Sequence, residues 1–189
     1  MTSEETLRDA ELVREALAAA AAGPLHAERA ADCTTRLIFG RPHEEVYGVC
    51  CSVAQYAVDA VTALACDRAV GAPEQGGPWR LDVLRPPLMT VREEDLEDAG
   101  IRVAARVGPQ LTVPRSRPVD PGDAFAYAFT TAYAAGGKGS ADTTGLFMDV
   151  AEDGLPFLTY CVAHLVRHVA LITSAAADVH LSVFRGRTT

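Results

Sequence analysis

The longest apolar stretch of the chain, residues 42–70, has the pattern of a single helix. Arg41-Pro42 before it and Gly71 after it are typical start and stop signals of a helix. Its polar side chains recur at steps of three and four residues, so they form one narrow stripe on an otherwise apolar cylinder. The stripe consists of Ser52, Gln55, Asp59 and Thr62. A helix that is apolar around most of its circumference must be covered by other elements.

The segment before this central helix predicts a further helix and a strand. Residues 3–22 place apolar side chains at helical spacing behind a capping residue, and Gly23-Pro24 ends the pattern. Residues 33–39 concentrate β-branched and large apolar side chains, which favours a strand.

The middle of the chain predicts a connection and a short acidic helix. Residues 71–90 are rich in Gly and Pro. Thr90 and Glu93 have the spacing of a capping box, so residues 91–98 are expected to form a helix whose acidic face is solvated. Residues 101–107 fit either a helix or a strand.

The second half of the chain changes to the period of a strand. Aromatic side chains stand at every second position in residues 123–130. Residues 143–150 run into Asp153-Gly154, a strong hairpin signal, after which residues 155–168 return as a long strand that could reach Ile172. With residues 110–115 as a preceding strand, this half predicts an antiparallel meander.

These elements predict a single α+β domain over residues 1–189. An antiparallel sheet of this length needs one face covered, and the central helix is the available cover. Long antiparallel sheets also leave edges that pairing protects, so a homodimer or a higher homo-oligomer is expected.

The composition limits the classes of partner that the protein is expected to bind. A formal net charge of -8 weighs against nucleic acid, because phosphate contacts need clustered Arg and Lys. The five cysteines include no Cys-x-x-Cys pair, which favours small buried hydrophobes in a reducing cytoplasm. The acidic N-terminus does not resemble an export signal, and no uninterrupted apolar run reaches the length that spans a membrane. We therefore expect a cytoplasmic protein that binds neither nucleic acid nor membrane.

Three side chains near the end of the chain could bind a metal if they lay on a helix. Cys161, His164 and His168 would then share one face and could hold zinc or haem. On a strand, Cys161 points away from the two histidines. Because the pattern favours a strand, we expect no metal and no cofactor.

The candidate chemistry instead lies on the central helix. His43 stands at its N-terminus, where the macrodipole disfavours an imidazolium and keeps the ring available as a base. Glu45 lies beside it, and Gln55 and Asp59 lie on the polar stripe. Acids that complement the helix N-terminus and a stripe that faces solvent are the alternative explanations.

Residues 117–123, Arg-Pro-Val-Asp-Pro-Gly-Asp, precede alternating alanines and aromatics. This segment resembles the R-x-P-V-x-P-G-D start of a strand in hotdog-fold dehydratases and thioesterases. The order of segments over residues 25–172 is most similar to the long-chain acyl thioesterase family that includes enoyl-carrier-protein glycyltransferases. Of that family's helix signature, His43 and Gln55 match, whereas Glu45, Gly48 and Ala54 depart from it.

The resemblance implies a hotdog-like sheet around the central helix and activity on an acyl thioester of coenzyme A or an acyl carrier protein. His43 and Glu45 would then be catalytic, and Gln55, Asp59 and Ser52 would bind the substrate. Hydrolysis, hydration or dehydration, and amine addition to an enoyl thioester remain open. The alternative is a non-catalytic hotdog subunit that binds an acyl chain or a protein partner.

Overall fold

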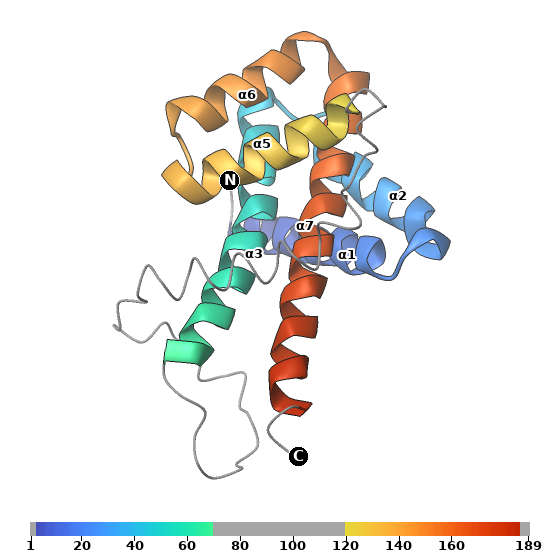
Figure 1. Ribbon diagram of the computed structural model, residues 1–189. Helices are drawn as coiled ribbons and strands as arrows, with labels where there is room; N and C mark the ends of the chain where they lie inside the picture. The colour runs from blue at the N-terminus through green and yellow to red at the C-terminus, as the bar shows by residue number, and fades with distance from the viewer. Residues whose placement is uncertain (1–2, 70–119, 186–189) are drawn as a thin grey trace.

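The computed structural model describes residues 3–69 and 120–185, and every element in these two segments is a helix (Figure 1). In chain order the elements are α1 (Ser3–Ala21), η1 (Pro24–His26), α2 (Ala27–Ile38), α3 (His43–Ala69), α5 (Pro121–Gly136), α6 (Ala141–Glu152) and α7 (Leu155–Arg185).

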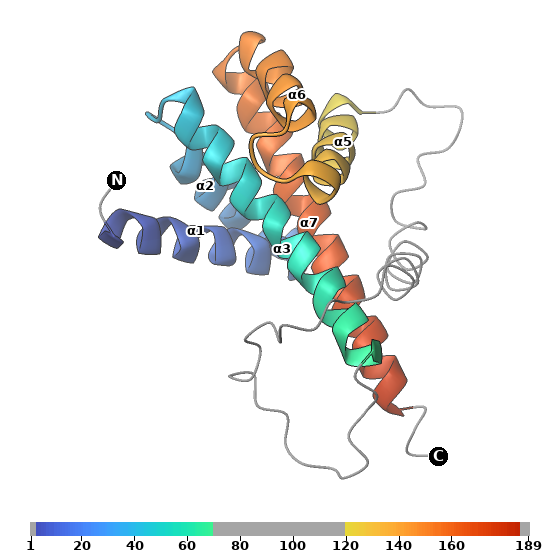
Figure 2. The same cartoon turned by 90° about the vertical axis from the view of Figure 1, so that its left-hand side faces the viewer.

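Helix α7 is the axis of the fold and contacts α1, α2, α3, α5 and α6. Helix α3 runs beside it, α1 crosses both of them, and α5 and α6 lie across one end (Figure 1). Beyond α1, the C-terminal parts of α3 and α7 continue side by side (Figure 2). The described fold is therefore a helical bundle at one end and a two-helix extension at the other.

Two apolar clusters hold these parts together. The larger one lines α7 at helical spacing with Leu158, Val162, Leu165 and Val169, all of them fully buried. Burying a side chain of this size stabilises a fold by about 1.5–3 kcal/mol relative to leaving it exposed. The smaller cluster, centred on Leu64, Ala175 and Ala176, joins α3 to α7 in the extension.

Both long helices are apolar enough, by length and composition alone, to cross a membrane. The segments are His43–Leu64 and Leu155–Asp178, of which 39% and 44% are buried inside the protein. Core helices of soluble proteins pass the same test, so these two helices do not decide where the protein resides. The expected cytoplasmic location stays a prediction.

The expected α+β hotdog fold, and with it the resemblance to hotdog thioesterases and dehydratases, is wrong. No strand occurs in residues 3–69 and 120–185, so no sheet of the described chain surrounds α3. The expected strands at 33–39, 123–130, 143–150 and 155–168 lie in α2, α5, α6 and α7. The expected elements at 91–98, 101–107 and 110–115 lie outside the described residues.

Alternating aromatics misled the prediction for α5. Phe125 and Phe129 are four residues apart, so a helix places both on one face, and both are buried. Tyr127 between them points outward and is 62% exposed. The spacers are mainly alanine, the best helix former, so the same residues satisfy helical spacing as well.

The turn before α7 was also misinterpreted. Gly154 adopts a φ of 95°, which suits a break between two helices as well as a hairpin. Pro156 lies in the first turn of α7, where proline is favoured and where its missing N–H has no intrahelical partner to lose. A strand of 14 or more residues would also be unusually long.

Helices do occupy the two segments in which the pattern indicated them. Helix α1 ends at Ala21, two residues before Gly23, and α3 begins directly after Pro42, whose carbonyl accepts hydrogen bonds from the N–H groups of Glu45 and Val46. A paired salt bridge joins α1 to the loop that precedes α3. The guanidinium of Arg41 donates to both carboxylate oxygens of Asp9 at 2.6 and 2.7 Å.

The contribution of this ion pair to stability can be tested, because a second, more exposed ion pair in the chain is available as a control. The hydrogen bonds from Arg41 hold the pKa of Asp9 below its usual range, and the two side chains are only 20% and 22% exposed. Asp9→Asn is expected to lower the free energy of unfolding by about 1 kcal/mol at pH 7. In the more exposed pair of Arg29 and Glu15, Glu15→Gln should cost no more than about 0.5 kcal/mol.

Urea unfolding measured from pH 7 down to pH 3 checks the prediction. The pKa of Asp9 is lower in the folded chain than the value of about 3.9 expected for an unfolded one, so the stabilisation is present above that pH. The difference between the native chain and Asp9→Asn should shrink as the pH falls through the folded pKa. A difference that is equal for both variants, or that grows at low pH, contradicts the assignment.

Candidate functional site

The first turn of α5 carries two carboxylates. Asp120 caps the helix, and its Oδ1 accepts hydrogen bonds from the N–H groups of Gly122 at 2.8 Å and Asp123 at 3.3 Å. Pro121 occupies the first helical position, where its fixed φ is favourable. Asp123 follows three residues after the cap, so both acids lie at the same end of α5.

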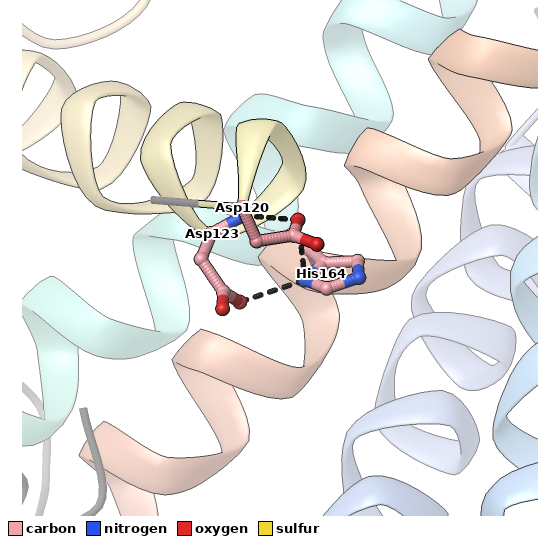
Figure 3. A group of neighbouring side chains, drawn as sticks. All are labelled: Asp120, Asp123 and His164. Atoms are coloured by element: carbon pink, nitrogen blue, oxygen red, sulfur yellow. Dashed lines mark hydrogen bonds and ion pairs between the residues drawn. The ribbon is translucent and has the colours of Figure 1, made fainter. Parts of the chain in front are cut away.

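Two rings from α7 meet these carboxylates, and Figure 3 shows one of them, that of His164. Nδ1 of His164 lies 2.7 Å from a carboxylate oxygen of Asp123 and 3.9 Å from Oδ1 of Asp120. One turn earlier on α7, the hydroxyl of Tyr160 donates to Oδ2 of Asp120 at 2.6 Å. The rings of Tyr160 and His164 are 4.4 Å apart. These four side chains form a polar cluster, the α5–α7 cluster, between segments that are about forty residues apart in sequence.

Gly122 allows the two helices to approach this closely. A Cβ atom at position 122 would lie 2.7 Å from Cγ of His164 and 2.8 Å from Cε1 of Tyr160, closer than carbon atoms in contact can be. Any larger residue would therefore push the start of α5 away from α7.

Hydrogen bonds shift the pKa values of two members of the cluster, Asp120 and Tyr160. The hydroxyl of Tyr160, together with the two backbone N–H donors, holds the pKa of Asp120 below its usual range. The same hydrogen bond raises the pKa of Tyr160 to about 12. At neutral pH Asp120 is therefore an anion, and Tyr160 keeps its proton to donate.

The cluster has the donor atoms of a metal site. One ligand atom from each of Asp120, Asp123 and His164 can be chosen so that all three lie within 4.8 Å of one another. The side chains are 40%, 39% and 18% exposed, so an ion can reach them from solvent. Carboxylate oxygen and imidazole nitrogen suit first-row divalent ions such as Zn²⁺ and Mn²⁺.

The argument that separated Cys161 from His164 and His168 is wrong, because these residues lie on the helix α7 and not on a strand. They do not form a joint metal site among the described residues, however: the group of potential ligands there contains His164 but neither Cys161 nor His168. Burial raises the pKa of the Cys161 thiol to about 11. Burial also lowers the pKa of His168, whose ring meets the edge of Tyr127 at 6.3 Å.

The site residues expected on α3 lie apart from this cluster. His43 and Glu45 are exposed at the start of α3, where the ring of His43 approaches that of Phe147 at 6.4 Å. Gln55 is twelve residues further along the same helix, about 18 Å from His43 along its axis.

The polar stripe of α3 connects helices to one another. Gln55 donates to Asp59 at 2.7 Å and accepts from the hydroxyl of Tyr133 on α5 at 2.8 Å. Ser52 donates to the carbonyl of Gly48 in its own helix and is exposed. The structure therefore brings Gln55 and Asp59 together, as expected, while a role of these residues in binding a substrate stays a prediction.

Sequence reasoning did not find the α5–α7 cluster, although one local signal was present. Asp120-Pro121, with a second acid at position 123, is the pattern of an N-cap, a first helical proline and an acidic first turn. It was interpreted as the start of a strand. The involvement of His164 had no local signal, because it depends on how α7 packs against α5.

No protein-family model matches this chain, and no curated protein or solved structure matches it significantly.

The close approach at Gly122 predicts that two Gly→Ala substitutions change the free energy of unfolding in opposite directions. Gly122→Ala is expected to lower the free energy of unfolding by about 1–3 kcal/mol, because the new methyl group collides with the rings of His164 and Tyr160. Gly145→Ala on α6 is the control, since a Cβ there meets nothing within 4 Å, and it should raise the free energy of unfolding by up to about 1 kcal/mol. Chemical unfolding of both variants measures this, and equal effects would contradict the described contact.

Proposed function

We propose that the protein binds a first-row divalent metal ion, of the Zn²⁺ or Mn²⁺ class, at Asp120, Asp123 and His164. The observation that carries this proposal is the convergence of two carboxylates and one imidazole from two helices within 4.8 Å. Bonds from such an ion to oxygen or nitrogen are about 2.0–2.2 Å long, so the ligands of one ion lie about 3–4 Å apart. The distances from Nδ1 of His164 to the oxygens of Asp123 and Asp120, 2.7 and 3.9 Å, lie close to that spacing.

The shortest contact of the cluster supports the proposal. Nδ1 of His164 and Oδ1 of Asp123 are in hydrogen-bond contact at 2.7 Å, and a metal ion bound between such a pair would replace the proton of this hydrogen bond. The negative charge of two carboxylates also exceeds the partial positive charge of about 0.5 at the N-terminus of α5, so the site as a whole attracts a cation.

The surroundings of the ligands support it as well. Ligating carboxylates in metal sites are themselves held by hydrogen bonds, and Asp120 is held by Tyr160 and by two backbone N–H groups. Three protein ligands leave coordination positions for water, which is the arrangement that catalytic metal sites share. An ion there would supply Lewis acidity to a molecule bound in an open position.

Activity on acyl thioesters, expected from the hotdog resemblance, stays a prediction. The fold from which that expectation came is not the one described, so we do not build the functional proposal on it.

Titration calorimetry with Zn²⁺ and Mn²⁺ tests the metal site. The native chain is expected to bind about one equivalent of ion, and Asp123→Asn and His164→Gln should each weaken binding at least about tenfold, because each removes a ligand. Asp142→Asn is the matched control: it removes an exposed acid from the first turn of α6, outside the cluster. This control should bind the ion as the native chain does.

Folding of each variant is verified by thermal unfolding without metal. An excess of ion should then raise the melting temperature of the native chain and of Asp142→Asn, but not of the two ligand variants. Binding that is equally strong in His164→Gln, or equally weakened in Asp142→Asn, would refute the assignment of the site.

A further inference from the structure

A groove of about 740 Å³ runs along α7, and none of its lining residues belongs to the α5–α7 cluster. Its opposite wall is the bend formed by the end of α1, η1 and α2 as far as Thr34. Seven of the fifteen lining residues are alanine and one is glycine, so the walls are made of short side chains. Walls of this kind let another helix approach closely, because few side chains stand between the two backbones.

The wall formed by α7 carries two opposite charges. Arg167 and Asp178 both line the groove and are both exposed. They are eleven residues apart, which on a helix corresponds to about 16 Å along the axis and to nearly the same direction around it. Neither side chain has a hydrogen bond or ion pair with a residue that the structure describes. The groove therefore offers a cation at one end and an anion at the other.

A second copy of α7 carries the same two charges, and in one orientation each of them meets the opposite charge of the groove. If the copy lies antiparallel in the groove, a two-fold axis passes midway between positions 167 and 178. Each Arg167 then faces the Asp178 of the other copy, and the contact is made twice. A parallel copy would place like charges together, so the charges select the antiparallel arrangement.

The side chains between the two charges are also placed symmetrically about this two-fold axis. Leu171 and Ser174 also line the groove, are half-buried, and are centred on the same midpoint as Arg167 and Asp178. In the antiparallel arrangement each Leu171 faces the Ser174 of the other copy, so a large side chain lies against a small one. Interfaces with two-fold symmetry need this kind of self-complementarity.

We infer that two copies of this chain associate through this groove, with their α7 helices antiparallel across a two-fold axis. A homodimer was first expected because a sheet would leave open edges. That reason disappears with the sheet, and the groove supplies a different one. The inference does not depend on the metal site, which lies between α5 and α7.

A small amphipathic anion is the other candidate occupant of an apolar groove with an arginine. It would pair with Arg167 but would leave Asp178 against its apolar part or unpaired. The second copy pairs both charges, which is why the charges favour it.

Charge reversal tests the arrangement by sedimentation equilibrium. The native chain should be a dimer, and Arg167→Glu and Asp178→Lys should each weaken dimerisation at least about tenfold, because two attractive pairs become repulsive. The double variant R167E/D178K should regain the native affinity. An equimolar mixture of the two single variants should form a heterodimer, since one Glu–Lys pair and one Arg–Asp pair are then satisfied.

Two control variants change the net charge by the same amounts as the test variants, but at positions outside the groove. Arg36→Glu on α2 and Asp149→Lys on α6 reverse exposed charges that do not line it, and both should dimerise as the native chain does. A native chain that is monomeric, or a double variant no better than the single ones, would overturn the inference. Native mass spectrometry that finds a monomer with a bound small amphipathic anion would overturn it in favour of that ligand.

Discussion

Helix α7 must bury apolar side chains over about half of its circumference, and the arrangement of the other described helices follows from this requirement. Its buried residues Cys161, Leu165 and Ala170 point in directions that together span about half a turn around the helix. No single neighbour can cover such a surface. Helices α1, α2, α3, α5 and α6 share the task, and each of them contacts α7.

The candidate site is a consequence of this coverage. The N-terminus of α5 reaches α7 at the turn that carries Tyr160 and His164, and the absence of a side chain at Gly122 lets it approach. The polar groups at that contact are hydrogen-bonded to one another, although Asp120 and Asp123 are also partly exposed to solvent. Asp120 and Asp123 satisfy the two rings, and the resulting set of oxygen and nitrogen atoms is also suited to a divalent ion.

The sequence predicted two long features of the fold and missed its class. The helices that became α1 and α3 were visible, since start and stop signals frame an apolar pattern in both. Helices α5 and α7 were interpreted as strands because alternating aromatics and Asp153-Gly154 were given more weight than the alanines, Pro156 and the length of the run. Those competing signals are local, so a stricter weighing of them could have predicted the helices.

The α5–α7 cluster could not be predicted from local sequence signals in the same way. His164 is 41 residues from Asp123, and only the packing of α5 on α7 brings them together. The residues favoured instead, His43 and Gln55, lie on one helix and were selected from its N-terminus and its polar stripe, with support from a resemblance to a fold that the described chain does not have. Local spacing shows which side chains share a face of one element, but it does not show which elements meet.

X-ray absorption at the zinc edge, on the native chain loaded with one equivalent of Zn²⁺, tests the proposed metal site most directly. Ligation by Asp120, Asp123 and His164 predicts a shell of oxygen and nitrogen at about 2.0–2.2 Å, with the scattering pattern of one imidazole. A sulfur shell at about 2.3 Å would instead assign the ion to a cysteine such as Cys161, and would contradict the account.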